Sequence, residues 1–170
     1  MRRPRVGDST TPADASLMPS AETAQSDTAR GVVRRVGPDP VSRLALFPVG
    51  SVDSAPLALD GAQLSELSAA EGLEVMIRGT RSADRAMDVA PGGAIVFHVG
   101  HFKVRALDGI EAHDGILVDV AGRMILETAS GTRTVIVNLP AALRTKRGAR
   151  VFLVGPLTRA PQAFGVLREP

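Results

Sequence analysis

Two short apolar runs, each bracketed by glycines, constrain this chain most strongly. They span residues 72–79 and 148–155, and in both the closing glycine stands seven residues after the opening one. A leucine precedes the opening glycine by five residues in each case, Leu67 in the first copy and Leu143 in the second. A glycine that ends a leucine-bearing helical stretch and opens a β-rich run predicts a strand leaving a short helix. The two copies therefore predict the same local structure twice.

The rest of the pattern also occurs twice, in the order strand, strand, strand, helix, strand, strand. In the first half the predicted strands are 32–36, 44–49, 57–59, 73–77 and 94–107, the last broken near Gly100, with a helix over 62–71. In the second half they are 116–120, 124–128, 134–139, 151–154 and 162–167, with a helix over 140–147. A repeat of this length with matching glycine punctuation favours a duplication.

Five short strands with one helix between the third and fourth resemble the OB-fold, a small Greek-key barrel. The resemblance covers residues 31–110 and 115–168, so we expect an all-β protein with two tandem OB-like barrels and one short helix per repeat. Each half is also similar to uncharacterised bacterial OB-like domains, some of them on lipoproteins. The alternative fold is one larger mixed barrel or sandwich. The resemblance implies a ligand, single-stranded nucleic acid, oligosaccharide or protein, on the face of the second and third strands.

Residues 1–30 are predicted to be a disordered tail, because they are rich in polar residues and hold few large aliphatic ones. No apolar run reaches the roughly 18–20 residues that a membrane helix needs. The start as written carries no export signal, which predicts a cytoplasmic protein. Residues 7–12 resemble the polar tether of bacterial lipoproteins, so a mis-assigned start codon would instead make the protein periplasmic or lipid-anchored.

A basic cluster surrounds the end of the second predicted helix. It consists of Arg144, Lys146, Arg147 and Arg150, with Arg159 and Arg168 nearby. Single-strand binders combine such charge with aromatic platforms, but the chain has five Phe, no Trp and no Tyr, and the Phe residues lie in apolar runs that predict a core position. The other reading is that these cations interact with the helix dipole. Nucleic acid is therefore an alternative partner that the sequence does not favour.

Three histidines, His98, His101 and His113, lie within sixteen residues and have acidic neighbours. Imidazoles with a carboxylate are ligands for Zn²⁺ or Ni²⁺, so a metal site is a second alternative. His98 and His101 would point to opposite faces of a strand unless Gly100 makes a bulge. His113 is predicted to lie in a turn with Asp114 and Gly115. The competing reading is that all three are surface histidines.

The chain has no cysteine, which excludes disulfides and thiolate sites. It also lacks the common nucleotide-binding, nucleophile-elbow and zinc-protease motifs, so we predict no enzyme activity and no cofactor. Apolar runs at 95–97 and 151–154 predict strands covered on both faces, by the other barrel, a homo-oligomer or a partner protein. The sequence thus favours a non-catalytic interaction module that binds a protein or a small ligand.

Overall fold

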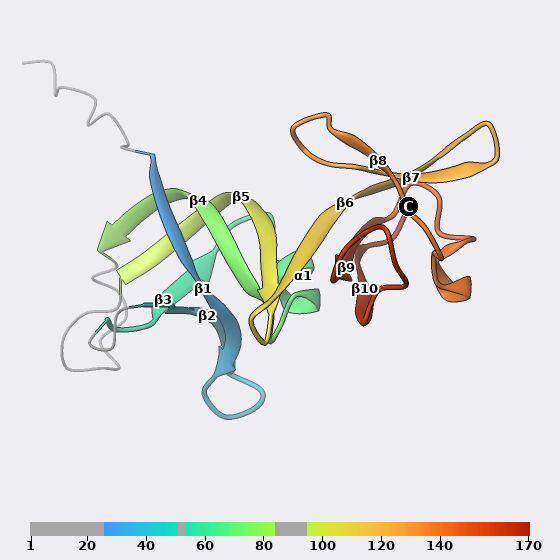
Figure 1. The fold of residues 1–170 in the computed structure, drawn as a ribbon. Coiled ribbons are helices and arrows are strands. Elements are labelled where there is room, and N and C mark those ends of the chain that lie inside the picture. The colour runs from blue at the N-terminus through green and yellow to red at the C-terminus, as the bar shows by residue number, and fades with distance from the viewer. Residues whose placement is uncertain (1–25, 51–53, 84–94) are drawn as a thin grey trace, which may run out of the picture.

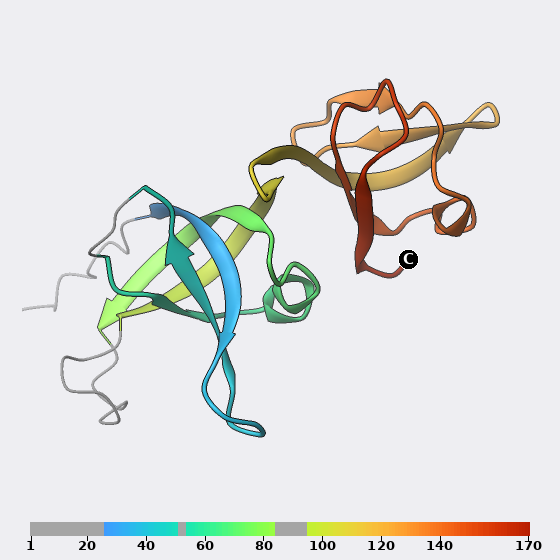
Figure 2. The ribbon, with the colours of Figure 1, turned by 60° about the horizontal axis from the view of Figure 1, so that its bottom comes forward.

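The chain folds into two β-rich halves that lie side by side (Figure 1). The computed structural model describes residues 26–50, 54–83 and 95–170. A hairpin joins the halves, and its tip is Asp108 and Gly109, both at positive φ. The one α-helix of the described residues lies on the side of the first half that faces the second (Figure 2). Ten strands, that short helix and one 3₁₀ turn within the described part of the chain confirm the predicted all-β class.

The five strands of the first half close on themselves. Its elements are β1 (Asp27–Val36), β2 (Arg43–Pro48), β3 (Leu57–Asp60), α1 (Leu64–Ala69), β4 (Glu74–Ala83) and β5 (Ile95–Leu107). Strand β1 pairs with β2 and β4, β2 pairs with β3, and β4 pairs with β5, all antiparallel. A parallel pairing of β3 with β5 completes the circuit. A closed circuit leaves this half without a free sheet edge.

The second half uses the same pairings but does not close. Its elements are β6 (Ile110–Val120), β7 (Arg123–Glu127), β8 (Arg133–Val135), η1 (Ala141–Leu143), β9 (Arg150–Val154) and β10 (Ala163–Arg168). Strand β6 pairs with β7 and β9, β7 pairs with β8, and β9 pairs with β10. Strands β8 and β10, both fully described, do not pair. The connectivity of the first half therefore recurs with one pairing missing.

The glycine that opens each apolar run makes the same backbone contacts in both halves. Its φ is +84° in each, a conformation that suits glycine. In the first half the Gly72 N–H donates to the Val33 carbonyl at 2.9 Å, and the Val33 N–H donates to the Leu73 carbonyl at 3.1 Å. In the second half the Gly148 N–H donates to the Leu117 carbonyl at 2.8 Å, and the Leu117 N–H donates to the Ala149 carbonyl at 3.0 Å. The predicted twin turns are thus equivalent in hydrogen bonding.

Several predicted boundaries differ from the structure. Residues 27–30, placed in the tail, form the start of β1 because they pair with β4; residues 1–25 lie outside the described part. Residues 80–83, placed in a loop, continue β4 because they pair with β5; the rest of that loop, 84–93, is also outside. The predicted helix over 140–147 is only the three-residue 3₁₀ turn η1. A helix so short needs tertiary support, and Leu143 is its one buried residue.

Strand β5 shows why the break near Gly100 matters. Opposite β4, the register passes from His101 to Val99, which leaves Gly100 as an extra residue. Phe97 and Val99 face the core before this bulge, and Phe102 faces it afterwards. Without the extra residue, strict alternation would place His101 inside in place of Phe102. The bulge therefore keeps both aromatic rings in the core.

The two halves have separate cores that meet at the junction. The first core centres on Phe97, Phe102 and Leu46, and the second on Leu117 and Leu153. Three buried residues of the second half belong to the first core: Ala112, Val154 and Leu167. The covered apolar strand face that the run 151–154 predicts is therefore explained within the chain by the other half.

A second pair of glycines lets the first two strands of each half approach closely. A Cβ on Gly31 would lie 2.3 Å from the carbonyl oxygen of Phe47, and one on Gly115 would lie 2.4 Å from that of Glu127. Both distances are far below van der Waals contact, and the obstacle is backbone. The prediction that His113, Asp114 and Gly115 form a turn was wrong, because Gly115 marks this close approach inside β6.

We expect Gly31→Ala and Gly115→Ala each to destabilise the protein by about 1–3 kcal/mol or more, as overpacking does. Gly100→Ala is the matched control, since its Cβ would meet only the carbonyl oxygen of Arg78 at 3.6 Å. Denaturant unfolding followed by circular dichroism measures the difference. A loss at Gly100 equal to that at Gly31 would contradict the close-approach explanation.

Candidate functional site

A groove lies on the first half, beside α1. It has a volume of about 570 Å³ and is lined by residues of β1, β2, β3, β5 and α1. Its apolar lining is Leu44, Ala58, Leu59, Leu64 and Val96, and its polar lining includes Arg35, Arg43, Asp60, Ser68 and His98. We call it the first groove. It occupies the second- and third-strand face on which the OB resemblance implies a ligand.

The polar rim of the first groove is held by side-chain contacts. The Arg35 Nη2 donates to the Ser68 Oγ at 2.8 Å, and its Nε lies 3.6 Å from a Glu71 carboxylate oxygen. The His98 Nδ1 lies 3.1 Å from an Asp60 carboxylate oxygen, and its Nε2 is 2.9 Å from the Ser82 Oγ. These contacts orient the Arg35 and His98 side chains at the rim while leaving them accessible to solvent.

The second half has a similar groove of about 560 Å³, which we call the second groove. Its lining is Asp119, Gly122, Arg123, Met124, Val135, Ile136, Leu139, Arg144 and Arg147. Two residues of the predicted basic cluster, Arg144 and Arg147, are thus brought to one groove. Arg123 joins them, and the sequence analysis did not single it out.

The two grooves occupy corresponding positions. Leu46 and Leu126 are the leucines whose side chains stand against Gly31 and Gly115, so they mark matching points on β2 and β7. Residues at the same sequence distance from these leucines, from their strand partners, or from Gly72 and Gly148 correspond in the two halves. The corresponding lining residues are Arg43 and Arg123, Leu44 and Met124, Ala58 and Val135, Leu59 and Ile136, and Ser68 and Arg144. Arg123 could have been found from the sequence by aligning the second strands of the two halves.

Ion pairs at corresponding positions have opposite polarity in the two halves. Beside the first groove, an arginine on β1 pairs with a glutamate after α1; beside the second, an aspartate on β6 pairs with an arginine after η1. These pairs are Arg35 with Glu71, at 3.6 Å, and Asp119 with Arg147, at 2.8 Å. The same reversal occurs next to the close-approach glycines, where Arg30 pairs with Glu74 and Asp114 pairs with Arg150.

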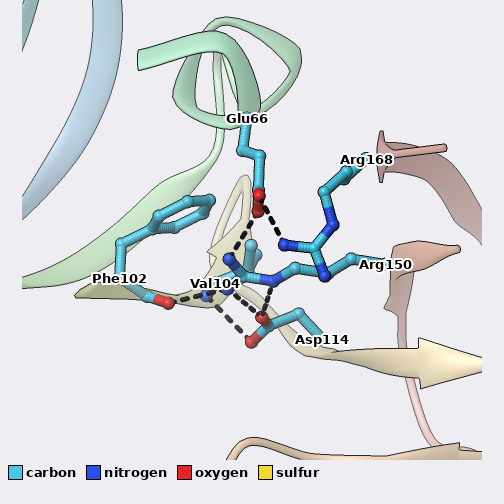
Figure 3. A network of polar contacts seen from close by, with 6 residues as sticks. All are labelled: Glu66, Phe102, Val104, Asp114, Arg150 and Arg168. Atoms are coloured by element: carbon cyan, nitrogen blue, oxygen red, sulfur yellow. Dashed lines mark hydrogen bonds and ion pairs between the residues drawn. The ribbon is translucent and has the colours of Figure 1, made fainter. Parts of the chain in front are cut away.

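Arg150 has a different environment from the other predicted basic residues. It is 8% exposed, and its guanidinium lies at the junction of the halves (Figure 3). It donates to the Asp114 Oδ2 at 3.1 and 2.5 Å, to the Glu66 Oε2 at 2.8 Å and to the Phe102 carbonyl at 2.7 Å. The guanidinium carbon also lies 4.2 Å from the centre of the Phe102 ring. A ligand could reach Arg150 only by opening this cluster.

Carboxylates connect the junction cluster to both halves. Glu66, on α1, accepts from Arg150 and also from Arg168 of β10, the latter at 2.9 Å. Asp114, on β6, accepts from the backbone N–H of Val104 at 3.1 Å. Each buried charge thus has an opposite charge and hydrogen bonds, which buried ions require. Helix α1 and strands β5, β6, β9 and β10 meet at this point.

The remaining predicted basic residues are partnered on the surface. Lys146 lies 2.8 Å from the Glu169 carboxylate, and the Arg144 Nε donates to the Leu139 carbonyl at 3.4 Å. Arg147 pairs with Asp119 at 2.8 Å. The four residues therefore lie in three places: Arg144 and Arg147 line the second groove, Lys146 forms an exposed ion pair, and Arg150 lies at the junction.

The three histidines of the metal prediction lie in different settings. His98 contacts Asp60 and Ser82 at the first groove, whereas His101 lines a small pocket at the junction. His113 is half-buried on β6, opposite Leu153 of β9. The Gly100 bulge leaves both His98 and His101 exposed. Within residues 26–50, 54–83 and 95–170, no three histidine, cysteine or acidic side chains gather as metal ligands.

No protein-family model matches the chain, and no curated protein or solved structure matches it either. None of the helices in the described residues has the length and apolar character to cross a membrane. The site must therefore be interpreted from its own residues.

We expect Glu66→Gln to reduce the free energy of unfolding by about 3 kcal/mol, because it leaves Arg150 in the junction with one carboxylate fewer. Glu71→Gln is the matched control: its partner Arg35 is exposed, and such pairs contribute about 0–1 kcal/mol. Guanidinium unfolding monitored by circular dichroism measures both variants. Equal, small losses would show that the junction cluster does not hold the halves together.

Proposed function

We propose that the chain is a non-catalytic binding module made of two OB-like barrels, each binding along the groove beside its short helix. One observation carries the proposal: both halves have a groove of nearly equal volume, lined by residues at corresponding strand positions. A duplicated barrel explains why the pairings, the glycine turns and the grooves all recur. The OB resemblance supports a ligand on this same face.

The lining of the grooves favours a segment of a partner protein as the ligand. Volumes near 560–570 Å³ lie within the usual range of about 300–1,000 Å³ for ligand sites. Each groove combines an apolar floor with arginines at its rim, and arginine binds carboxylates through two parallel hydrogen bonds. An extended peptide with apolar and acidic side chains matches this combination.

Single-stranded nucleic acid is the second candidate, and the second groove is the observation that favours it. Three arginines, Arg123, Arg144 and Arg147, line this groove with one aspartate. Bases bind such a groove by stacking on aromatic rings, each worth about 1–3 kcal/mol. Neither groove has an aromatic residue other than His98 in its lining, which is why a peptide ranks above an oligonucleotide.

Panning the full chain against displayed random peptides of about 12 residues tests the proposal. We expect enriched peptides to carry acidic and apolar residues and to bind in fluorescence anisotropy. Ala58→Arg fills the first groove and Val135→Arg fills the second. At least one of these variants should weaken binding about tenfold or more, since one lost anchor contributes about 1.4 kcal/mol.

Val49→Arg is the control, because Val49 is 48% exposed and lines neither groove. It should leave peptide affinity unchanged. Peptide binding that survives both groove variants would refute the proposal. Oligo-dT is assayed in parallel: affinity that falls steeply between about 50 and 200 mM salt, and that is lost in Arg144→Glu, would favour the nucleic-acid candidate.

A further inference from the structure

A cationic face covers β4 and β5 of the first half, away from both grooves. Its four residues are Arg78, His101, Lys103 and Arg105, and all are exposed. On β5 they alternate with the fully buried Phe102 and Val104, so they point outward. Arg78 lies directly opposite His101 in the β4–β5 pairing. The bulge at Gly100 therefore sets which side chains form this face.

The charge of the cationic face is not neutralised within the described part of the chain. None of its four residues forms an ion pair there, although ten ion pairs occur elsewhere in that part. The neighbouring carboxylates of Glu74 and Asp114 are paired with Arg30 and Arg150. Arg78, Lys103 and Arg105 thus leave three uncompensated positive charges on this sheet face.

The cationic face leads into a pocket between the two halves, which we call the junction pocket. It has a volume of about 260 Å³ and is lined by His101, Lys103, Asp114, Thr128, Ala129 and Ser130. The first half supplies the imidazole of His101 and the ammonium of Lys103, and the turn after β7 in the second half supplies the hydroxyls. The Thr128 and Ser130 hydroxyls hydrogen-bond to each other at 2.9 Å. Hydroxyl, ammonium and imidazole N–H groups all bind oxyanions.

Asp114 does not oppose an anion in the junction pocket. Its Oδ1 accepts from the Val104 N–H, and its Oδ2 accepts from Arg150, which balances its charge. The pocket is smaller than the range of about 300–1,000 Å³ typical of drug-sized ligands. It can hold one or two phosphate groups. Alternate residues of a strand lie roughly 6.8 Å apart, so Lys103 and Arg105 would contact successive parts of a chain of phosphates.

We propose that the junction pocket and the cationic face bind a linear oligophosphate. Its terminal phosphate sits against His101, Lys103 and the hydroxyls of Thr128 and Ser130. Arg78 lies opposite His101 and so contacts the same end of the ligand, while the following phosphates extend along Arg105. This face has no aromatic side chain other than His101, since Phe97 and Phe102 are fully buried on the opposite side of the sheet. The face therefore offers no stacking platform for bases, and phosphate alone is recognised.

Isothermal titration of the full chain with tripolyphosphate tests this proposal, with orthophosphate and sulfate at matched ionic strength. We expect saturable binding of tripolyphosphate and a higher thermal unfolding midpoint, because a ligand held by both halves stabilises the folded state. Lys103→Gln combined with Arg105→Gln should weaken binding about tenfold or more. Thr128→Ala with Ser130→Ala should weaken it less, because it removes only neutral donors.

Lys146→Gln is the charge-matched control, since its ammonium pairs with Glu169 away from this face, and it should bind normally. Ala58→Arg should also bind normally, which separates failure of this proposal from failure of the groove proposal. Absence of saturable binding would overturn the proposal, and so would equal weakening by Lys146→Gln. Oligo-dT, duplex DNA or anionic vesicles that bind more tightly than tripolyphosphate would replace the oligophosphate with that partner.

We also propose that the reversed ion pairs direct each first strand to its own partner during folding. Strands β1 and β6 are alike where they pair: Gly31 faces Val75 of β4, and Gly115 faces Val151 of β9. Both valines are fully buried. Little in the apolar pattern therefore prevents β1 from pairing with β9. Repeated domains are prone to this kind of misassembly.

Charge distinguishes the correct pairing from the incorrect one. In the native structure Arg30 meets Glu74, and Asp114 meets Arg150. Exchanging the partners would place Arg30 against Arg150 and Asp114 against Glu74. Like charges opposed across two strands are destabilising. The reversal thus makes both incorrect pairings unfavourable at once.

Combining Arg30→Glu with Glu74→Arg gives this pair the same polarity as Asp114 with Arg150 and tests this second proposal. We expect a similar thermal midpoint but about twofold or greater loss of refolded monomer after dilution from guanidinium. Arg30→Gln with Glu74→Gln should give an intermediate yield, which keeps the test informative if the first variant fails to fold. Glu127→Arg with Arg133→Glu is the control, because that exposed pair joins β7 to β8 and involves neither first strand. Unchanged refolding of the swapped variant would overturn the proposal.

Discussion

The buried ion cluster around Arg150 determines how the two halves are arranged. Its guanidinium donates to carboxylates from both halves and to the Phe102 carbonyl, so hydrogen bonds compensate for its burial. Removing one charged partner from such a cluster lowers the free energy of unfolding strongly, because the remaining charge stays buried without compensation. An intact cluster, in contrast, stabilises the fold little more than apolar side chains of the same size would. The apolar contact of Leu167 with the first core lies beside it. Together they hold the halves at one junction, where the junction pocket forms.

Backbone geometry explains why the two halves look alike despite their different side chains. Two glycines in each half have the same structural roles. Gly72 and Gly148 form the turn after the helical segment, and Gly31 and Gly115 let the second strand approach the first. These contacts involve main-chain atoms, so the residues around them can change. The ion pairs beside them have reversed their polarity, and Ser68 in the first groove corresponds to Arg144 in the second.

The differences between the halves separate their proposed roles. The second groove has three arginines and an aspartate in its lining, whereas the first has two arginines, an aspartate and a histidine. The β4–β5 face carries cations that no carboxylate of the described residues balances. Two halves with the same strand connectivity therefore present three chemically different surfaces. The surfaces share the framework but not the side chains that would select a ligand.

The sequence by itself determined the all-β class, the order of the strands and the glycine turns, because these follow from local pattern: apolar periodicity, glycine punctuation and β-branched runs. It overestimated the second helix, which is only the 3₁₀ turn η1. The bulge at Gly100 was also foreseeable from a glycine between two histidines in a strand. Only the tertiary structure decided that Arg150 is buried at the junction while Arg144 lines a groove. It also decided that Gly115 lies within a strand. A local sequence pattern does not predict which carboxylate pairs with a distant arginine. Nor does it predict which carbonyl a glycine approaches, since both contacts join residues far apart in the chain.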